Sequence, residues 1–123
     1  MVNPGVEGEQ VVAQWLEEQG AEVLHRRWRC PWGELDLIAR WDDIVVFVEV
    51  KTRSPKNWDE NGLLAISPQK QERLRNAAEY FLAQVPELSE CPCRFDVALV
   101  HYWPQSTDSN SSFTILDYLQ EAF

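Results

Sequence analysis

The chain has 123 residues, of which 45% are hydrophobic and 25% are charged, and these values are typical of a globular protein. Its length predicts one domain over residues 1–123, and its longest apolar run, residues 44–48, is too short to cross a membrane. The first ten residues lack the basic start and the apolar stretch of a signal peptide, so we expect a cytoplasmic protein with no membrane partner.

The net charge of −9 is unfavourable for binding nucleic acid, because phosphate binding depends on Lys and Arg. The charges are unevenly distributed, however. All 11 basic residues lie between Arg26 and Arg94, whereas residues 1–25 carry five acidic residues and residues 95–123 carry four. The middle of the chain is therefore neutral and could present a basic face; scattered bases on an acidic surface are the alternative.

A helix is predicted over residues 5–19, where Val12, Ala13 and Leu16 recur at the spacing of one helical face. Gly20 is expected to end it as a C-terminal cap. Glu9 lies on the same apolar stripe, so its carboxylate should point toward the protein interior. A buried carboxylate needs a partner that offsets the cost of its desolvation.

Three strands are predicted next, over residues 22–29, 34–41 and 44–52, with a two-residue turn at Asp42 and Asp43. A polar loop over residues 53–65 leads to a second helix that begins at Ser67 and Pro68 and stops at Pro86. Residues 94–103 alternate as a strand, and residues 113–118 fit either a last strand or the start of a short helix. The order αβββαβ predicts an α/β fold with a mixed central sheet flanked by helices.

The two-residue turn also predicts which residues face each other in the hairpin. Facing positions have numbers that sum to 85, which places Asp36 opposite Glu49 and Glu34 opposite Lys51. All four would lie on one face of the sheet. The other face would hold the apolar members of both strands, Leu35, Leu37, Val48 and Val50.

Opposed carboxylates about 5 Å apart repel each other, so Asp36 and Glu49 require a neutralising partner. Hard carboxylate oxygens at this range are the ligands that Mg²⁺ or Mn²⁺ prefers, and the carbonyl of Val50 could add a ligand. Lys51 could also offset part of the repulsion. The alternative is an ordinary ladder of ion pairs, with Glu34 on Lys51 and Asp36 on a nearby arginine.

Several motifs of this chain resemble the YraN family of bacterial proteins. They are Gly8-Glu9 with Ala13, the GELDLI segment from residue 33, the FVEVKTR segment from residue 47, Lys70, and the RFD segment from residue 94. The resemblance covers about residues 5–102. YraN-like proteins are described as predicted endonucleases, similar in fold to archaeal Holliday junction resolvases of the PD-(D/E)XK superfamily. The resemblance to this family therefore implies a restriction-endonuclease-like αβββαβ core and metal-dependent hydrolysis of DNA.

Roles for individual residues follow from the same resemblance. It implies that Asp36 and Glu49 bind Mg²⁺ or Mn²⁺, that Lys51 aligns or activates the attacking water, and that Glu9 assists from the first helix. Lys70 could reach either the site or a phosphate. The chain departs from the family in two respects, since Arg27 stands where the family usually has Asn and the acidic balance is unlike that of a resolvase.

DNA is the expected partner, and the candidates for holding its backbone are Arg26, Arg27, Arg29, Arg53, Lys56 and Lys70. Trp28, Trp32 and Trp58 could stack on unpaired bases or pack at the rim of the core. Cutting a four-way junction would require a homodimer. A non-catalytic binding module on the same fold is the main alternative function. A glycosidase-type carboxylate pair is disfavoured, because Lys51 between the two acids is expected to keep both ionised.

Overall fold

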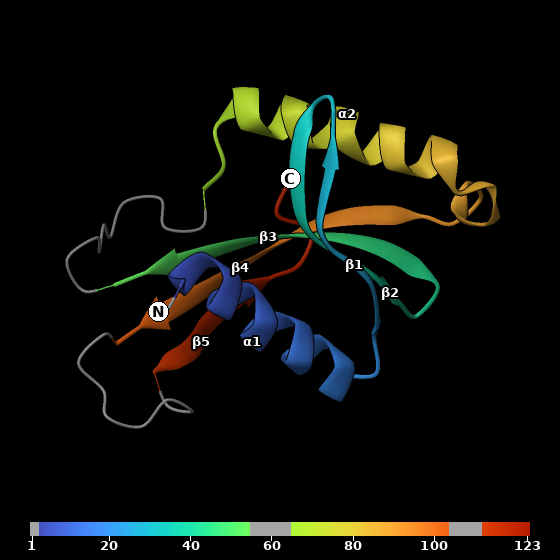
Figure 1. The fold of residues 1–123 in the computed structure, drawn as a ribbon. Coiled ribbons are helices and arrows are strands. Elements are labelled where there is room, and N and C mark those ends of the chain that lie inside the picture. Colours follow the sequence, from blue (N-terminus) through green and yellow to red (C-terminus); the bar gives the residue numbers. More distant parts are fainter. Residues whose placement is uncertain (1–2, 55–64, 104–111) are drawn as a thin grey trace.

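A computed structural model describes residues 3–54, 65–103 and 112–123. Its elements, in chain order, are α1 (Pro4–Glu18), β1 (Glu22–Cys30), β2 (Gly33–Trp41), β3 (Ile44–Arg53), α2 (Pro68–Gln84), a short 3-10 helix (Pro86–Leu88), β4 (Cys93–Tyr102) and β5 (Phe113–Leu119). The sheet separates the two α-helices, with α1 against one face and α2 against the other (Figure 1). Lys56 and Trp58 lie outside the described residues, as does most of the polar loop predicted over residues 53–65.

The five strands form one sheet in the order β1-β2-β3-β4-β5. Strands β3 and β4 are parallel, and the other neighbouring pairs are antiparallel. The parallel pair requires a long crossover, which α2 provides. The predicted α/β fold is confirmed, since a mixed sheet with two flanking helices is consistent with a restriction-endonuclease-like αβββαβ core. Residues 113–118, which fit either a strand or a helix by sequence, lie in the edge strand β5.

Local capping residues define where both helices begin and end. In α1 the Asn3 side chain accepts a hydrogen bond from the Val6 N–H, and Gly20 follows the last turn with a φ of +97°. The Gly20 and Ala21 N–H groups donate to the last carbonyls of α1, which is a Schellman ending. In α2 the Ser67 hydroxyl accepts from the Lys70 N–H. These caps confirm the predicted boundaries to within one residue, because capping chemistry is local.

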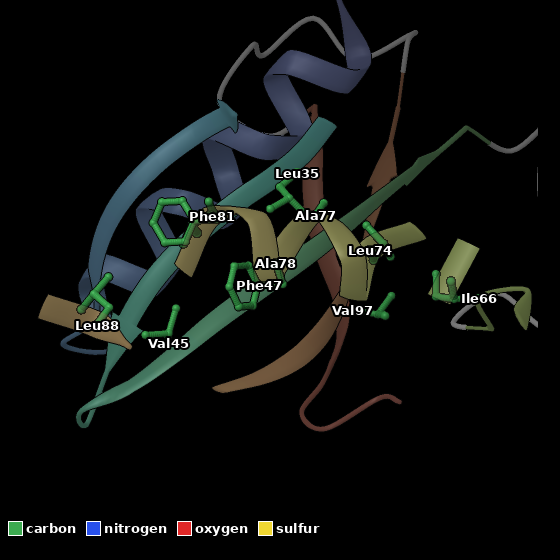
Figure 2. Close-up of a cluster of buried hydrophobic side chains, with 11 residues drawn as sticks. Leu35, Val45, Phe47, Ile66, Leu74, Ala77, Ala78, Phe81, Leu88 and Val97 are labelled. Carbon is green, nitrogen blue, oxygen red and sulfur yellow. The ribbon is translucent and has the colours of Figure 1, made fainter. Parts of the chain in front are cut away.

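Two apolar clusters attach the helices to the sheet. On one face Val12, Ala13 and Leu16 of α1 are fully buried, as predicted, against residues of β2, β3 and β4. On the other face α2 packs against residues of β2, β3 and β4; Figure 2 shows this cluster, with Phe47 beside the α2 side chains. The sequence predicts a core stripe of Leu74, Ala77, Ala78, Phe81, Leu82 and Val85 for this helix; the first four are buried, and Leu82 and Val85 are partly buried against the same cluster.

The β2–β3 hairpin confirms the predicted turn and register over most of its length. Asp42 and Asp43 both have positive φ, at 51° and 63°, as a two-residue I′ turn requires. The five pairs from Trp41–Ile44 to Leu37–Val48 follow the predicted pairing. The regular ladder ends there, one position before the expected Asp36–Glu49 pair.

The ladder ends beside Arg27 of β1, which lies between the pairs Arg26–Leu37 and Trp28–Leu35 and has a φ of +51°, so the β1–β2 hairpin bends there. Beyond the bend the hairpin rises toward α2 (Figure 1). Strict alternation predicted that Leu35 and Leu37 share a face, and this was wrong: Leu35 packs in the α2 cluster and Leu37 in the α1 cluster. The bend places Asp36 between Leu37, which faces α1, and Leu35, which faces α2.

No helix within the described segments is long and apolar enough to cross a membrane.

Candidate metal centre

The first carboxylate of the site comes from α1, which packs closely against β3. A Cβ atom on Gly8 would lie 2.1 Å from the Thr52 hydroxyl oxygen, so only glycine permits this approach. The next residue, Glu9, is thereby directed at the sheet and is only 9% exposed. This position confirms that Glu9 lies on the inward stripe.

Asp36 supplies the second carboxylate, at the bend of β2. Its Oδ2 atom accepts a hydrogen bond from the Val50 N–H at 2.8 Å, so the side chain stands between β2 and β3. Carboxylate oxygens of Glu9, Glu34 and Asp36 lie within 4.8 Å of one another. Three acidic groups from α1 and β2 therefore converge on one point.

The crowding of these acids has a clear electrostatic consequence. Burial, together with the charges of Glu49 and Glu9, raises the pKa of Asp36 to about 7, although the Val50 N–H and the Lys70 ammonium oppose the shift. Burial also raises the pKa of Glu9, against the opposing effect of the Arg27 guanidinium. For Asp36 this contradicts the expectation that Lys51 keeps the carboxylate fully ionised, because desolvation outweighs the nearby cations.

Glu34 is the member of this cluster for which the predicted hairpin register gave the wrong partner. It was expected opposite Lys51, but it faces Arg29 on β1 instead. Its two oxygens bind the Arg27 and Arg29 Nε atoms at 3.3 and 3.0 Å. The signal was present in the sequence: a tight turn at Pro31 and Trp32 would have paired these residues across the first hairpin as well.

Glu49 is buried at the centre of β3 and is bound by a cation from the opposite helix. The Lys70 Nζ atom lies 2.5 Å from Glu49 Oε1. Lys70 therefore reaches the site from the first turn of α2, which answers the question left open by its position in the sequence. Lys51 Nζ donates to the carbonyl of Ala65, and burial with the charges of Arg53 and Lys70 lowers the pKa of Lys51, against the effect of Glu49.

The carboxylate cluster fits a small divalent cation. Among the residues that the structure describes, the buried Oε1 atom of Glu9 has no hydrogen-bond partner, and the nearest cation, Arg27 Nε, is 3.7 Å away. Metal–oxygen bonds of about 2.1 Å place opposing ligand oxygens about 4.2 Å apart, and the oxygens of this cluster lie within 4.8 Å of one another. A cation would satisfy the Glu9 oxygen and offset the repulsion that raises the pKa of Asp36.

The residues predicted to bind nucleic acid do not all lie at this site. Arg27 and Arg29 border it through Glu34, and Arg53, the last residue of β3, donates to the Thr52 carbonyl. Arg26 pairs instead with Glu17 near the C-terminal end of α1. Of the tryptophans, Trp28 packs against Phe81 with the ring centroids 5.2 Å apart, whereas Trp32 is 49% exposed at the tip of the β1–β2 turn.

Comparisons with known proteins agree with the family that the sequence motifs suggested. Residues 8–100 match the model of the uncharacterised protein family UPF0102. A UPF0102 protein of Synechococcus sp. is 54% identical over 98% of this chain and 90% of its own length. A UPF0102 protein of Thermosynechococcus vestitus is 48% identical over the whole chain and 95% of its own length. The relationship expected from the YraN-like motifs is confirmed, and the chain belongs to the UPF0102 family.

Proposed function

We propose that this protein is a metal-dependent endonuclease of the PD-(D/E)XK type that hydrolyses phosphodiester bonds in DNA. The observation that carries the proposal is the convergence of Glu9, Glu34 and Asp36, whose oxygens lie within 4.8 Å of one another beside Glu49. Crowded acids with a raised pKa destabilise the folded protein, and such clusters are concentrated at functional sites.

Each residue then has a distinct task. Glu9 and Asp36 would hold Mg²⁺ or Mn²⁺, with Glu49 and the Val50 carbonyl as further ligands once Lys70 releases Glu49. Bound there, the cation would polarise a phosphoryl oxygen and lower the pKa of a bound water. Lys51, whose pKa is already lowered by burial, would orient that water and stabilise negative charge on the phosphate.

The net charge of −9 does not oppose this proposal as strongly as it first suggests. Much of the acidic charge lies far from the site, for example Glu17 and Glu18 at the end of α1 and Asp43 at the β2–β3 turn. Asp43 is six residues along the strand from Glu49, or about 20 Å. The Debye length at physiological ionic strength is about 8 Å, so these acids are largely screened from a bound phosphate.

A glycosidase fits the site less well, although Asp36 has the raised pKa that a general acid needs. The two carboxyl groups of a glycosidase stand at least about 5 Å apart to admit a sugar carbon or water between them. Oxygens of three acids, Glu9, Glu34 and Asp36, lie within 4.8 Å of one another, and such a triple convergence favours a single small ion over a two-acid site. A binding module without turnover remains the competing function, and only an assay separates it from an enzyme.

The test is cleavage of a labelled four-way junction, flap, duplex and single strand in the presence of Mg²⁺ or Mn²⁺. Wild type is compared with Asp36→Asn and Lys51→Ala, and with Asp43→Asn as a matched control at the exposed turn. We expect cleavage by wild type and by the control, and loss of cleavage in both site variants. Calorimetric titration with Mn²⁺ should show binding that Asp36→Asn abolishes.

Two outcomes would contradict the proposal. Metal binding without cleavage of any substrate would favour the binding module, and cleavage that persists in Asp36→Asn would place the reaction elsewhere. If the junction is the preferred substrate, two sites must act on opposing strands, and sedimentation should then detect a homodimer at the assay concentration.

A further inference from the structure

The tip of the β1–β2 hairpin carries an exposed aromatic ring beside the candidate metal centre. Trp32 is 49% exposed, whereas Trp28 on the same hairpin is packed against Phe81. A single exposed tryptophan is not unusual, because much of a protein surface is apolar. Its surroundings, however, distinguish it from other exposed apolar side chains.

The turn that presents Trp32 is attached to α2 by a specific contact. The Arg73 Nη1 atom donates to the Trp32 carbonyl at 3.4 Å. The next residue, Gly33, has a φ of +124°, and a Cβ atom there would lie 2.1 Å from the same guanidinium. Arg73 therefore fixes the backbone of the turn, and the indole is displayed from a defined position.

The charges around the indole suit a nucleotide. Arg73 contacts the backbone of the turn, and Arg29, whose side chain is 82% exposed, pairs with Glu34 in the second residue pair from the tip of the same hairpin. Glu34 belongs to the metal cluster and is only two residues from Trp32, about 7 Å along the strand. An aromatic face with adjoining arginines is the arrangement that binds unpaired bases together with their phosphates.

We infer that Trp32 is a stacking platform for an unpaired base located a few nucleotides from the bond that is cut. The inference rests on the proposed nuclease function and specifies its substrate as DNA with an unpaired strand beside the site. In fully paired DNA each base face is covered by its neighbours, so Trp32 could not stack.

The experiment uses the intact protein and three substrates: a blunt duplex, the same duplex with a single-stranded flap, and that flap with abasic sites next to the branch. Binding is measured in EDTA and cleavage in Mn²⁺. Trp32→Ala is compared with the conservative Trp32→Phe, and with Tyr80→Ala, a similarly exposed aromatic on α2. Thermal unfolding verifies that each variant is folded.

We expect wild type to bind the flap roughly 5- to 100-fold more tightly than the abasic flap, as the energy of one stacked base implies. Trp32→Ala should lose this difference, while Trp32→Phe and Tyr80→Ala should keep most of it. If binding follows this pattern without cleavage, the platform is supported and the nuclease proposal fails.

Other results overturn the inference. If wild type cleaves DNA but Trp32→Ala retains the same preference for the flap, the platform is refuted and the nuclease proposal stands. If wild type neither binds nor cleaves any of the three substrates, both are refuted.

Discussion

Replacing Asp36 with Asn should stabilise the metal-free protein, because the ionised carboxylate is unfavourable in the folded state. The pKa of Asp36 is raised to about 7 by burial and by the neighbouring acids, from about 3.9 in an unfolded chain. The folded protein therefore binds the proton more strongly than the unfolded chain does. Between these two values the contribution of Asp36 to the free energy of unfolding of wild type decreases as the pH rises.

The magnitude follows from the difference between the two pKa values. Asn does not titrate, and its side-chain oxygen can still accept the hydrogen bond from the Val50 N–H. At 1.36 kcal/mol per pKa unit, the variant should be more stable than wild type by about 1 kcal/mol at pH 4.5 and about 4 kcal/mol at pH 8.5. For a chain of this length, the larger value corresponds to a rise in Tm on the order of 10 °C.

The assay is urea unfolding in EDTA at pH 4.5 and 8.5, with Asp43→Asn as the control for an aspartate whose side chain is 86% exposed. The control should change stability by less than about 0.5 kcal/mol at either pH. Saturating Mg²⁺ should stabilise wild type but not Asp36→Asn, and so reduce the difference at pH 8.5. A variant that is less stable than wild type at pH 8.5, or a difference independent of pH, would refute the reasoning.

Three further substitutions test the neighbouring contacts. Gly8→Ala should lower the free energy of unfolding by about 1–3 kcal/mol and abolish most metal binding, because the added Cβ meets the Thr52 hydroxyl. In the double variant, Thr52→Ala should restore both stability and metal binding, and additive losses would contradict this explanation. Lys70→Met leaves Glu49 without its cation, so Mg²⁺ should raise the Tm of this variant more than that of wild type. Equal increases in Tm for the two proteins would contradict the role of this ion pair. Tyr118→Phe removes the 2.7 Å hydrogen bond to the fully buried Asp96 and should lower stability by about 1–3 kcal/mol in urea unfolding, with metal affinity unchanged.

The sequence by itself determined the features that depend on neighbouring residues. The stripe of α1 placed Glu9 toward the interior, and Ser67 with Pro68 marked the start of α2. Asp42 and Asp43 set the register of the β2–β3 hairpin, since a two-residue turn permits one pairing of the strands. Periodicity, caps and tight turns are local, and they can therefore be read without the rest of the fold.

Only the tertiary structure decided how the site is assembled. Packing of the β1–β2 hairpin toward α2 bends β2 at Asp36, and this moves Leu35 to the other face and Glu34 away from Lys51. The contact between Lys70 and Glu49 likewise joins α2 to β3, which are separated in the chain by a loop. Strict alternation assumes a regular strand, whereas the hairpin also makes contacts between residues about 40 positions apart, such as Trp32 and Arg73. Such contacts leave no local pattern in the sequence.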